Sequence, residues 1–300
     1  MSTWQGKSRG GVLGYKAFVL MLNTFGLRFS YFVLRFVSLY FVFAAPDAAR
    51  YSYRYFRYRL GFSRFKSAIG VYRNYYSFAQ VLCDKIALLS GKGNMYTFNF
   101  DGKHHLQKMV AEGKGGILIS AHMGNWEIAS QLLSGLGVKV NVVMMDVEYD
   151  QIKNYVSSVT GQRQYNIIPL KQDMSHIFGI SNALINKEFI CIHGDRFVEE
   201  AKVMGIEFLG GQAYFPTGPF AISKRLKVPA TYVYAMKESD THYHFFATEP
   251  FTFEHSLREF ITSYANELEK KVHQYPYQWF NYYDFWQQDW PKLNIDKDSR

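Results

Sequence analysis

The prediction of the fold starts from the segment GGILISAHMGNWEIASQ, residues 115–131. Its apolar run Ile117–Ile119, continued by Ser120 and Ala121, is typical of a strand buried on both faces of a sheet. The strand ends at His122. A turn glycine and an asparagine follow at positions 124 and 125, and an asparagine side chain can cap a helix that begins at Trp126. The segment therefore predicts a strand, a tight turn and a helix.

His122 and Glu127 are the candidate catalytic pair of this segment. Ligands of open α/β sheets bind at the carboxyl ends of the strands, which is where His122 lies. Glu127, five positions later in the first helical turn, could orient it. Two structural alternatives stay open: a carboxylate that complements the helix dipole, and a strand-end histidine held by another neighbour. The second match to this spacing, His244 to Glu249, lies in an alternating strand whose positions five apart face opposite sides.

Residues 94–300 alternate between strand and helix patterns, which predicts an α/β fold: a mostly parallel sheet flanked by helices. No internal repeat and no Gly-x-Gly-x-x-Gly fingerprint is found in the sequence. We expect eight strands, over residues 96–100, 116–121, 138–145, 165–170, 189–193, 203–208, 230–236 and 242–248. We expect six helices, over residues 104–112, 126–136, 149–159, 174–186, 219–226 and 255–273.

The net charge of +9 is concentrated in the first quarter of the chain. Residues 1–83 hold twelve Lys and Arg against the single acid Asp47, whereas the remainder has twenty-two basic and twenty-four acidic residues. Such a block suits either nucleic acid or an anionic bilayer. Its basic residues alternate with long apolar runs, and 18% of all residues are aromatic, which favours a membrane and disfavours nucleic acid.

Two apolar segments, residues 17–27 and 29–45, are separated by Gly26 and Arg28 and precede the α/β pattern. Seventeen helical residues span roughly 25 Å, against a hydrocarbon core of about 30 Å. The region could cross a membrane once, or lie as a helical hairpin embedded from one side. A cleaved signal peptide is disfavoured because Arg28 and Arg35 interrupt the apolar region and the polar leader is long.

The segment RYSYRYFRYR, residues 50–59, alternates arginine with aromatic residues. We expect Tyr51, Tyr53, Tyr55 and Tyr58 to lie at the level of lipid headgroups and the arginines to meet phosphate on the cytoplasmic side. A solvated basic face of a soluble helix is the alternative. We predict a membrane-anchoring helical region over residues 1–60 and a catalytic α/β domain over residues 61–300, with a long helix at residues 62–90.

Further polar residues follow the predicted strands. Asp195 and Arg196 come after the strand at 189–193, so we expect both to face the substrate cleft beside His122. Arg196 could bind a phosphate or carboxylate of a substrate, or the two could form an ion pair closing a loop. Thr217 and Gly218 form a helix N-terminus suited to an anion. The two cysteines have no metal or disulfide spacing, and His193 with Asp195 is too small a set for a metal site, so we expect neither metal nor cofactor.

With its basic, apolar N-terminal region and a strand that ends in AHMGNWE, the sequence resembles the bacterial lipid A late acyltransferases, within the glycerolipid and lysophospholipid acyltransferase group. The segments IHGDRF (192–197) and FLGGQAYFPTGPFAISKRLKVPATYVY (208–234) resemble later blocks of that family. The resemblance implies an inner-membrane protein facing the cytoplasm. It would transfer a fatty acyl group from a carrier thioester, acyl carrier protein or acyl-CoA, to a hydroxyl of a lipid acceptor, with His122 as base and Glu127 as its partner.

One departure concerns the acceptor. The aromatic tail YPYQWFNYYDFW, residues 275–286, has Asp284 where the family usually has an arginine-rich turn, so an aminolipid or another lysolipid is an alternative to a lipid A precursor. A non-catalytic, membrane-tethered binding domain is the alternative to an enzyme. The tail could line an acyl channel or cover the sheet.

The chemistry of acyl transfer assigns further expectations. Histidine is neutral near pH 7 and can take the proton of an attacking hydroxyl. The developing oxyanion needs donors, and the backbone amides of Gly124 and Asn125 are the nearest candidates in sequence. The alternative for Asn125 is a helix cap alone.

Overall fold

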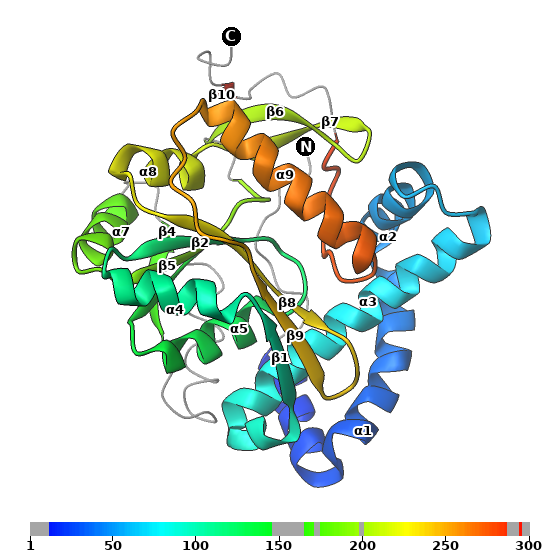
Figure 1. Ribbon diagram of the computed structural model, residues 1–300. Coiled ribbons are helices and arrows are strands. Elements are labelled where there is room, and N and C mark those ends of the chain that lie inside the picture. Colours follow the sequence, from blue (N-terminus) through cyan, green and yellow to red (C-terminus); the bar gives the residue numbers. More distant parts are fainter. Residues whose placement is uncertain (1–11, 146–164, 171–174, 198–200, 287–293, 296–300) are drawn as a thin grey trace.

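The computed structural model describes residues 12–145, 165–170, 175–197, 201–286 and 294–295. Its centre is a seven-stranded sheet with strand order β1-β9-β8-β2-β5-β3-β4 (Figure 1). Neighbouring strands are parallel except for the antiparallel pair β8 and β9. The strands are β1 (Thr97–Asp101), β2 (Gly116–Ser120), β3 (Val140–Met145), β4 (Asn166–Leu170), β5 (Phe189–His193), β8 (Ala230–Lys237) and β9 (His242–Ala247). The predicted α/β fold with a mostly parallel sheet is confirmed.

Strand β2 lies in the middle of this sheet, and all five of its residues are buried. Ile117 and Ile119 belong to one hydrophobic cluster, with Phe260 and Tyr264 of a helix that covers that face. Leu118 belongs to another cluster on the opposite face. An unbroken apolar run is what a strand covered on both faces requires.

The helices that flank the sheet are close to the predicted ones. They are α4 (Lys103–Glu112), α5 (Trp126–Leu133), α7 (Ser175–Ile185), α8 (Gly218–Leu226) and α9 (Leu257–Gln274). Helix α5 ends before Leu136 because its last turn tightens into a 3₁₀ turn, η4 (Ser134–Leu136). Ser256 caps α9 together with Glu259, in a capping box. The predicted helix at residues 149–159 lies outside the described residues.

A second, smaller sheet was not anticipated from the sequence. Strand β6 (Lys202–Phe208) pairs antiparallel with β7 (Gly211–Pro216), and β10 (Asn294–Ile295) pairs with β6. The sequence between β6 and α8 contains Gly210, Gly211 and Pro216, which are typical of a loop, so no strand was expected there. The hairpin forms because Leu209 and Gly210 both adopt positive φ at the turn, 50° and 67°.

The N-terminal apolar segments form one long helix, α1 (Val12–Ala44), which is kinked at Gly26. Gly26 has φ 81°, a conformation that glycine adopts without strain, so the predicted break at this position is present as a kink. One face of α1 is buried, with Leu22, Tyr31 and Leu34 among its residues. Helix α1 packs along α3 (Arg64–Ala87) (Figure 1).

The opposite face of α1 carries large apolar side chains that no part of the described chain covers. Phe25, Phe36 and Phe43 are 63%, 60% and 75% exposed. Within the described residues, residues 16–44 of α1 form the one helix that is long and apolar enough to cross a membrane. An apolar patch of this kind marks a surface that meets lipid or another protein.

The arginine- and tyrosine-rich segment forms α2 (Pro46–Arg54) and a π-helical turn, η1 (Tyr55–Arg59). Tyr58 is exposed, which a ring in the headgroup layer requires. The prediction for Tyr55 is wrong: its ring is buried and its hydroxyl donates to the carbonyl of Pro276 in the C-terminal tail. The ring of Tyr55 is buried because it packs against the C-terminal tail, a contact that the local sequence pattern does not indicate.

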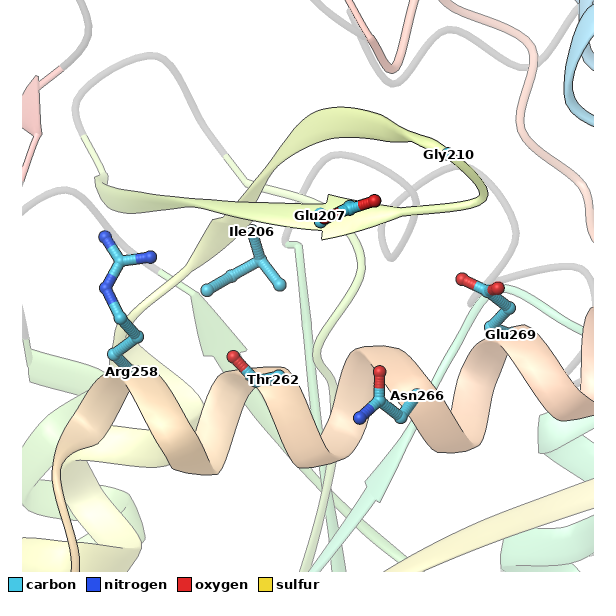
Figure 2. A pocket seen from close by; sticks show the side chains of 7 residues that line it. All are labelled: Ile206, Glu207, Gly210, Arg258, Thr262, Asn266 and Glu269. Atoms are coloured by element: carbon cyan, nitrogen blue, oxygen red, sulfur yellow. The ribbon is translucent and has the colours of Figure 1, made fainter.

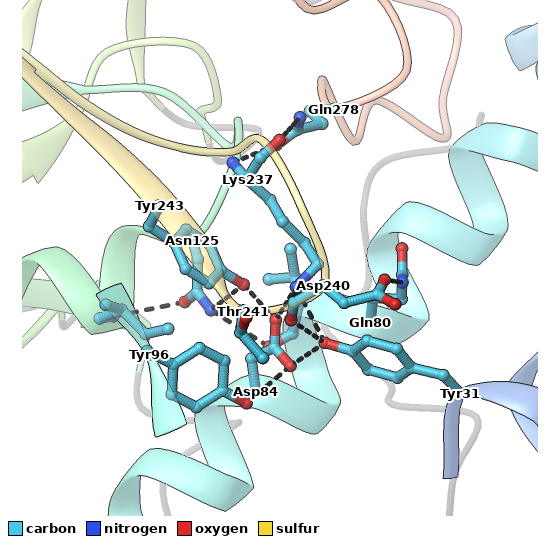
Figure 3. A network of polar contacts seen from close by, with 12 residues as sticks. Tyr31, Gln80, Asp84, Tyr96, Asn125, Lys237, Asp240, Thr241, Tyr243 and Gln278 are labelled. Atoms are coloured by element: carbon cyan, nitrogen blue, oxygen red, sulfur yellow. Dashed lines mark hydrogen bonds and ion pairs between the residues drawn. The ribbon is translucent and has the colours of Figure 1, made fainter. Parts of the chain in front are cut away.

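A buried ion pair connects the N-terminal helices with the sheet. Lys237 at the end of β8 lies 2.6 Å from Asp84 of α3, whose side chain is fully buried. The hydroxyls of Tyr31, Tyr96 and Tyr243 also donate to Asp84 (Figure 3). Four donors satisfy this carboxylate, so residues of α1, α3, β8 and β9 share one polar centre, which lies across the predicted boundary at residue 60. That domain division stays a prediction.

We predict that Asp84→Asn lowers the free energy of unfolding by about 3–5 kcal/mol, because it leaves the buried ammonium of Lys237 without a counter-charge. Lys237→Met should cost less, because three hydroxyls continue to donate to Asp84. Urea unfolding in detergent micelles measures both. Asp47→Asn, which removes an exposed ion pair with Arg50, is the control and should change stability by less than about 1 kcal/mol.

Candidate active site

His122 and Asp195 form a hydrogen-bonded pair at the carboxyl edge of the sheet. Strands β2 and β5 are parallel neighbours with Ser120 opposite His193, so the residues that follow both strands meet at one rim. His122 Nδ1 lies 2.7 Å from Asp195 Oδ1. The backbone amide of His122 donates to the second oxygen of Asp195 over 2.9 Å. The carboxylate thus fixes both the main chain and the ring of His122.

The contacts of Asp195 favour its ionised form. Its side chain is 2% exposed, and the indole Nε1 of Trp279 donates a third hydrogen bond to it over 3.1 Å. Burial alone would raise the pKa of this carboxyl group. The charge and hydrogen bond of His122, together with Arg196, outweigh the burial and hold the pKa of Asp195 well below its usual range.

The same contacts determine which nitrogen of His122 is basic. Nδ1 carries the proton because it donates to Asp195, so Nε2 has the free lone pair. Burial and the nearby charge of Arg196 lower the pKa of His122 from 6.5, and Asp195 opposes them only in part. The imidazole is therefore neutral at pH 7, as a general base must be.

Asp195 is thus the carboxylate that holds Nδ1 of His122. Glu127 lies in the first turn of α5, as predicted, but its side chain is outside the described structure. Its contact with His122 stays a prediction. Asp195 was expected to bind substrate, whereas both of its oxygens are used to hold His122 and Trp279.

Gly124 and Asn125 have structural roles in the turn. Gly124 has φ 62°, and a Cβ atom there would lie 2.1 Å from the carbonyl oxygen of Ala235, so only glycine fits. The side chain of Asn125 accepts the amide of Ile128 and caps α5.

The predicted oxyanion donors are already engaged. The amide of Gly124 donates to the carbonyl of Gln278, and the amide of Asn125 donates to the carbonyl of Ala235. Both amides therefore serve the fold, and a different donor is needed for any oxyanion formed beside His122.

The C-terminal aromatic tail forms a wall of this site. Trp279 pairs with Met123 in an isolated β-bridge, and the amide of Phe280 donates to the carbonyl of His122 over 2.9 Å. Trp279 and Phe280 are both 1% exposed. The tail covers the turn and supports Asp195, a role that no local sequence pattern indicated.

His193, the last residue of β5, lies directly beside His122. The two ring centroids are 4.2 Å apart, and the ring of His193 also meets Trp126 edge-on at 5.1 Å. One feature of the sequence could have indicated His193 as a site residue. It ends a buried strand, and His122 lies just after the end of another.

The remaining predicted site residues lie in different surroundings. The guanidinium of Arg196 donates to the carbonyl of Phe280, so the tail holds it beside the His122–Asp195 pair. No direct ion pair between Arg196 and Asp195 is found among the described contacts.

Thr217 is buried, and both its amide and its hydroxyl donate to the carbonyl of Lys202. Thr217 and Gly218 stand at the start of α8, and anion binding there stays a prediction.

A separate hollow of about 410 Å³ lies between β6 and α9 (Figure 2). Two of its charged side chains are paired with the main chain: Arg258 donates to the carbonyl of Gly205, and Glu269 accepts the amide of Leu209. None of its lining residues belongs to the group around His122. The hollow therefore has no part in the candidate site.

A base held by a buried carboxylate, at the carboxyl edge of a mostly parallel sheet, defines an enzyme of the α/β class. Residues 71–288 match the model of the family described as bacterial lipid A biosynthesis acyltransferase, and the chain belongs to this family. It is a lipid acyltransferase.

One solved structure compared with the chain is the 1-acyl-sn-glycerophosphate (LPA) acyltransferase PlsC from Thermotoga maritima. The two share 15% sequence identity, over 81% of this chain and 97% of that one, with a TM-score of 0.39. Comparison with curated protein sequences gives no match.

We predict that Asp195→Asn lowers the rate of acyl transfer by about 10²–10⁴-fold, because an amide cannot stabilise the imidazolium or hold the required tautomer. His122→Ala should cost at least as much, and the double variant should be no slower than His122→Ala alone, since the two residues act as a unit. Asp101→Asn, on an exposed edge strand, is the control. Additive losses would contradict a shared role.

The pH dependence of the reaction tests the state of His122. The neutral imidazole is the active form and its pKa is lowered from 6.5, so kcat/KM should rise with pH through an inflection below 6.5 and then stay level. Arg196→Gln should move the inflection upward, because it removes a charge that disfavours the imidazolium. A wild-type inflection above pH 7 would contradict this assignment.

Proposed function

We propose that this enzyme moves a fatty acyl group from an acyl carrier thioester to a hydroxyl of a lipid A precursor, at the cytoplasmic face of a bacterial inner membrane. The observation that carries the proposal is the neutral His122, held through Nδ1 by buried Asp195, in a member of the lipid A acyltransferase family. The donor is acyl carrier protein or acyl-CoA.

In this reaction, Nε2 of His122 takes the proton of the acceptor hydroxyl as its oxygen attacks the thioester carbonyl carbon. The carbonyl electron pair moves to oxygen and gives a tetrahedral oxyanion. When the oxyanion collapses, the carbon–sulfur bond breaks and the thiolate receives the proton from the imidazolium. An ester and a free thiol result. Asp195 stabilises the imidazolium throughout, so no covalent enzyme intermediate is required.

The surface of the N-terminal helices supports a membrane location. The exposed phenylalanines of α1 suit a hydrocarbon phase. The segment that follows α1 is basic, and Arg50 lies over the ring of Tyr51 at 5.5 Å. Arginine and tyrosine at the end of an apolar helix favour the headgroup layer and a cytoplasmic orientation.

An aminolipid or another lysolipid is the second candidate acceptor. Asp284 of the tail lies 3.6 Å from Arg54 of α2, so its carboxylate reduces the positive charge available to a phosphorylated sugar at that place. This ion pair favours a less anionic acceptor.

Lipid profiling of cells that lack the protein distinguishes the acceptors. We predict that one lipid species loses a single acyl group, and that wild-type protein restores the lost group whereas the His122→Ala variant does not. A lipid A species short of one chain supports the first acceptor, and an aminolipid short of one chain supports the second. An unchanged lipid profile would favour a non-catalytic binding domain.

Membrane attachment is tested on the exposed face of α1. We predict that the triple substitution of Phe25, Phe36 and Phe43 by serine reduces the fraction of protein that sediments with membranes, because each buried phenylalanine contributes roughly 1.5–3 kcal/mol. Phe178→Ser is the control, since Phe178 is 80% exposed on α7, away from α1. Unchanged sedimentation of the triple variant argues against α1 as the anchor.

A further inference from the structure

We propose that His193 is a second catalytic residue, whose ring N–H donates a hydrogen bond to the carbonyl oxygen of the acyl thioester as that oxygen becomes an oxyanion. The inference rests on the proposed function, because it concerns the acyl donor of that reaction. It assigns the electrophilic part of catalysis, as His122 is assigned the basic part.

The first step of the argument is the need for a donor. The tetrahedral intermediate places a negative charge on oxygen, and preorganised donors for that charge are usually the largest single contribution to catalysis. The amides of Gly124 and Asn125, which lie next to His122 in sequence, donate to main-chain carbonyls. The donor must therefore come from another strand end at the same rim.

The second step is position. Strand pairing places His193 opposite Ser120, two residues before His122, and the two imidazole rings are in contact at a centroid distance of 4.2 Å. A carbonyl carbon attacked by a hydroxyl that is bonded to His122 lies within a few ångströms of that ring. The neighbouring imidazole is therefore within reach of the carbonyl oxygen.

The third step is the free hydrogen-bonding capacity of His193. Asp195 holds Nδ1 of His122, whereas in the described parts of the chain the ring nitrogens of His193 make no hydrogen bond. The ring is half-buried, in edge contact with Trp126. A neutral imidazole always carries one N–H donor, and here a substrate atom can accept it.

The fourth step is charge. Burial and the nearby imidazole of His122 lower the pKa of His193 well below its usual value, and Arg196 contributes in the same direction. His193 is thus neutral at working pH. A neutral imidazole donates a hydrogen bond to the oxyanion without transferring its proton. His122 then remains the group that exchanges protons with the substrate.

In the balanced reaction His193 neither gains nor loses a proton. The acceptor proton goes to Nε2 of His122 and then to the leaving thiolate. The electron pair of the carbonyl double bond moves to oxygen, and the N–H of His193 donates a hydrogen bond to the resulting oxyanion. The electron pair returns when the carbon–sulfur bond breaks.

The test compares His193→Leu with His193→Gln, which have similar volume but differ in whether the side chain can donate a hydrogen bond. Thiol release is measured from acyl carrier protein thioesters, with membranes from cells that lack the protein as the source of acceptor. We expect kcat to fall about 10²–10³-fold in the leucine variant, with KM for the thioester nearly unchanged. The glutamine variant should recover at least about tenfold of that loss.

The controls separate the possible outcomes. His104→Ala changes an exposed histidine of α4 and should leave kcat unchanged. Thermal unfolding of the leucine and glutamine variants checks that both fold, and His193→Met, which also lacks an N–H donor, replaces the leucine variant if that one does not fold. A kcat within about threefold of wild type in both variants, or a loss confined to KM, overturns the assignment of His193.

The proposed function fails in a different way. If wild-type protein releases no thiol, or if His122→Ala releases it as fast as wild type, the acyl-transfer proposal itself is wrong. If wild type is active and His122→Ala is inactive, the His193 variants test the role of His193 independently of the proposed function.

Discussion

The parallel pairing of β2 with β5 is the constraint on which the site depends. Because Ser120 and His193 are opposite each other, the residues that follow both strands are delivered to one edge of the sheet. His122 comes from one strand end and Asp195 from the other, and they meet although 73 residues separate them. A shift of the register by one residue would turn each side chain to the opposite face of the sheet. The core that buries β2 on both faces therefore also sets the catalytic geometry.

Two further contacts keep this edge in place. Gly124 lies so close to the carbonyl of Ala235 that the turn after His122 is pressed against β8. Asn125 donates to the hydroxyl of Tyr243, which in turn donates to Asp84 (Figure 3). The polar centre that holds α1 on the sheet is thus connected by hydrogen bonds with the turn of the catalytic segment, so the membrane-facing helix and the site share a support.

The aromatic tail adds a third element to the same centre. It brings an indole donor to Asp195 and main-chain groups to His122 and Arg196. Its rings also pack against η1, where Tyr55 meets Trp279 edge-on and donates to the carbonyl of Pro276. The tail lies at the far end of the chain, so the site combines residues 122–125, 195–196 and 278–280.

Local sequence is sufficient to predict the α/β class, because the periods of strand and helix and the apolar run before His122 are set by neighbouring residues. It also determined His122 as the candidate base, the glycine turn, the cap at Asn125 and the break at Gly26, since each depends on residues within a few positions. The partner of Nδ1 could be identified only in the folded chain, because Asp195 reaches His122 through strand pairing and not through spacing along the sequence. For the same reason the sequence missed Trp279 and His193, and it favoured amides of Gly124 and Asn125 that the fold uses elsewhere. Long-range contacts of this kind leave no period in the sequence, because the distance between two side chains is set by the strands that carry them.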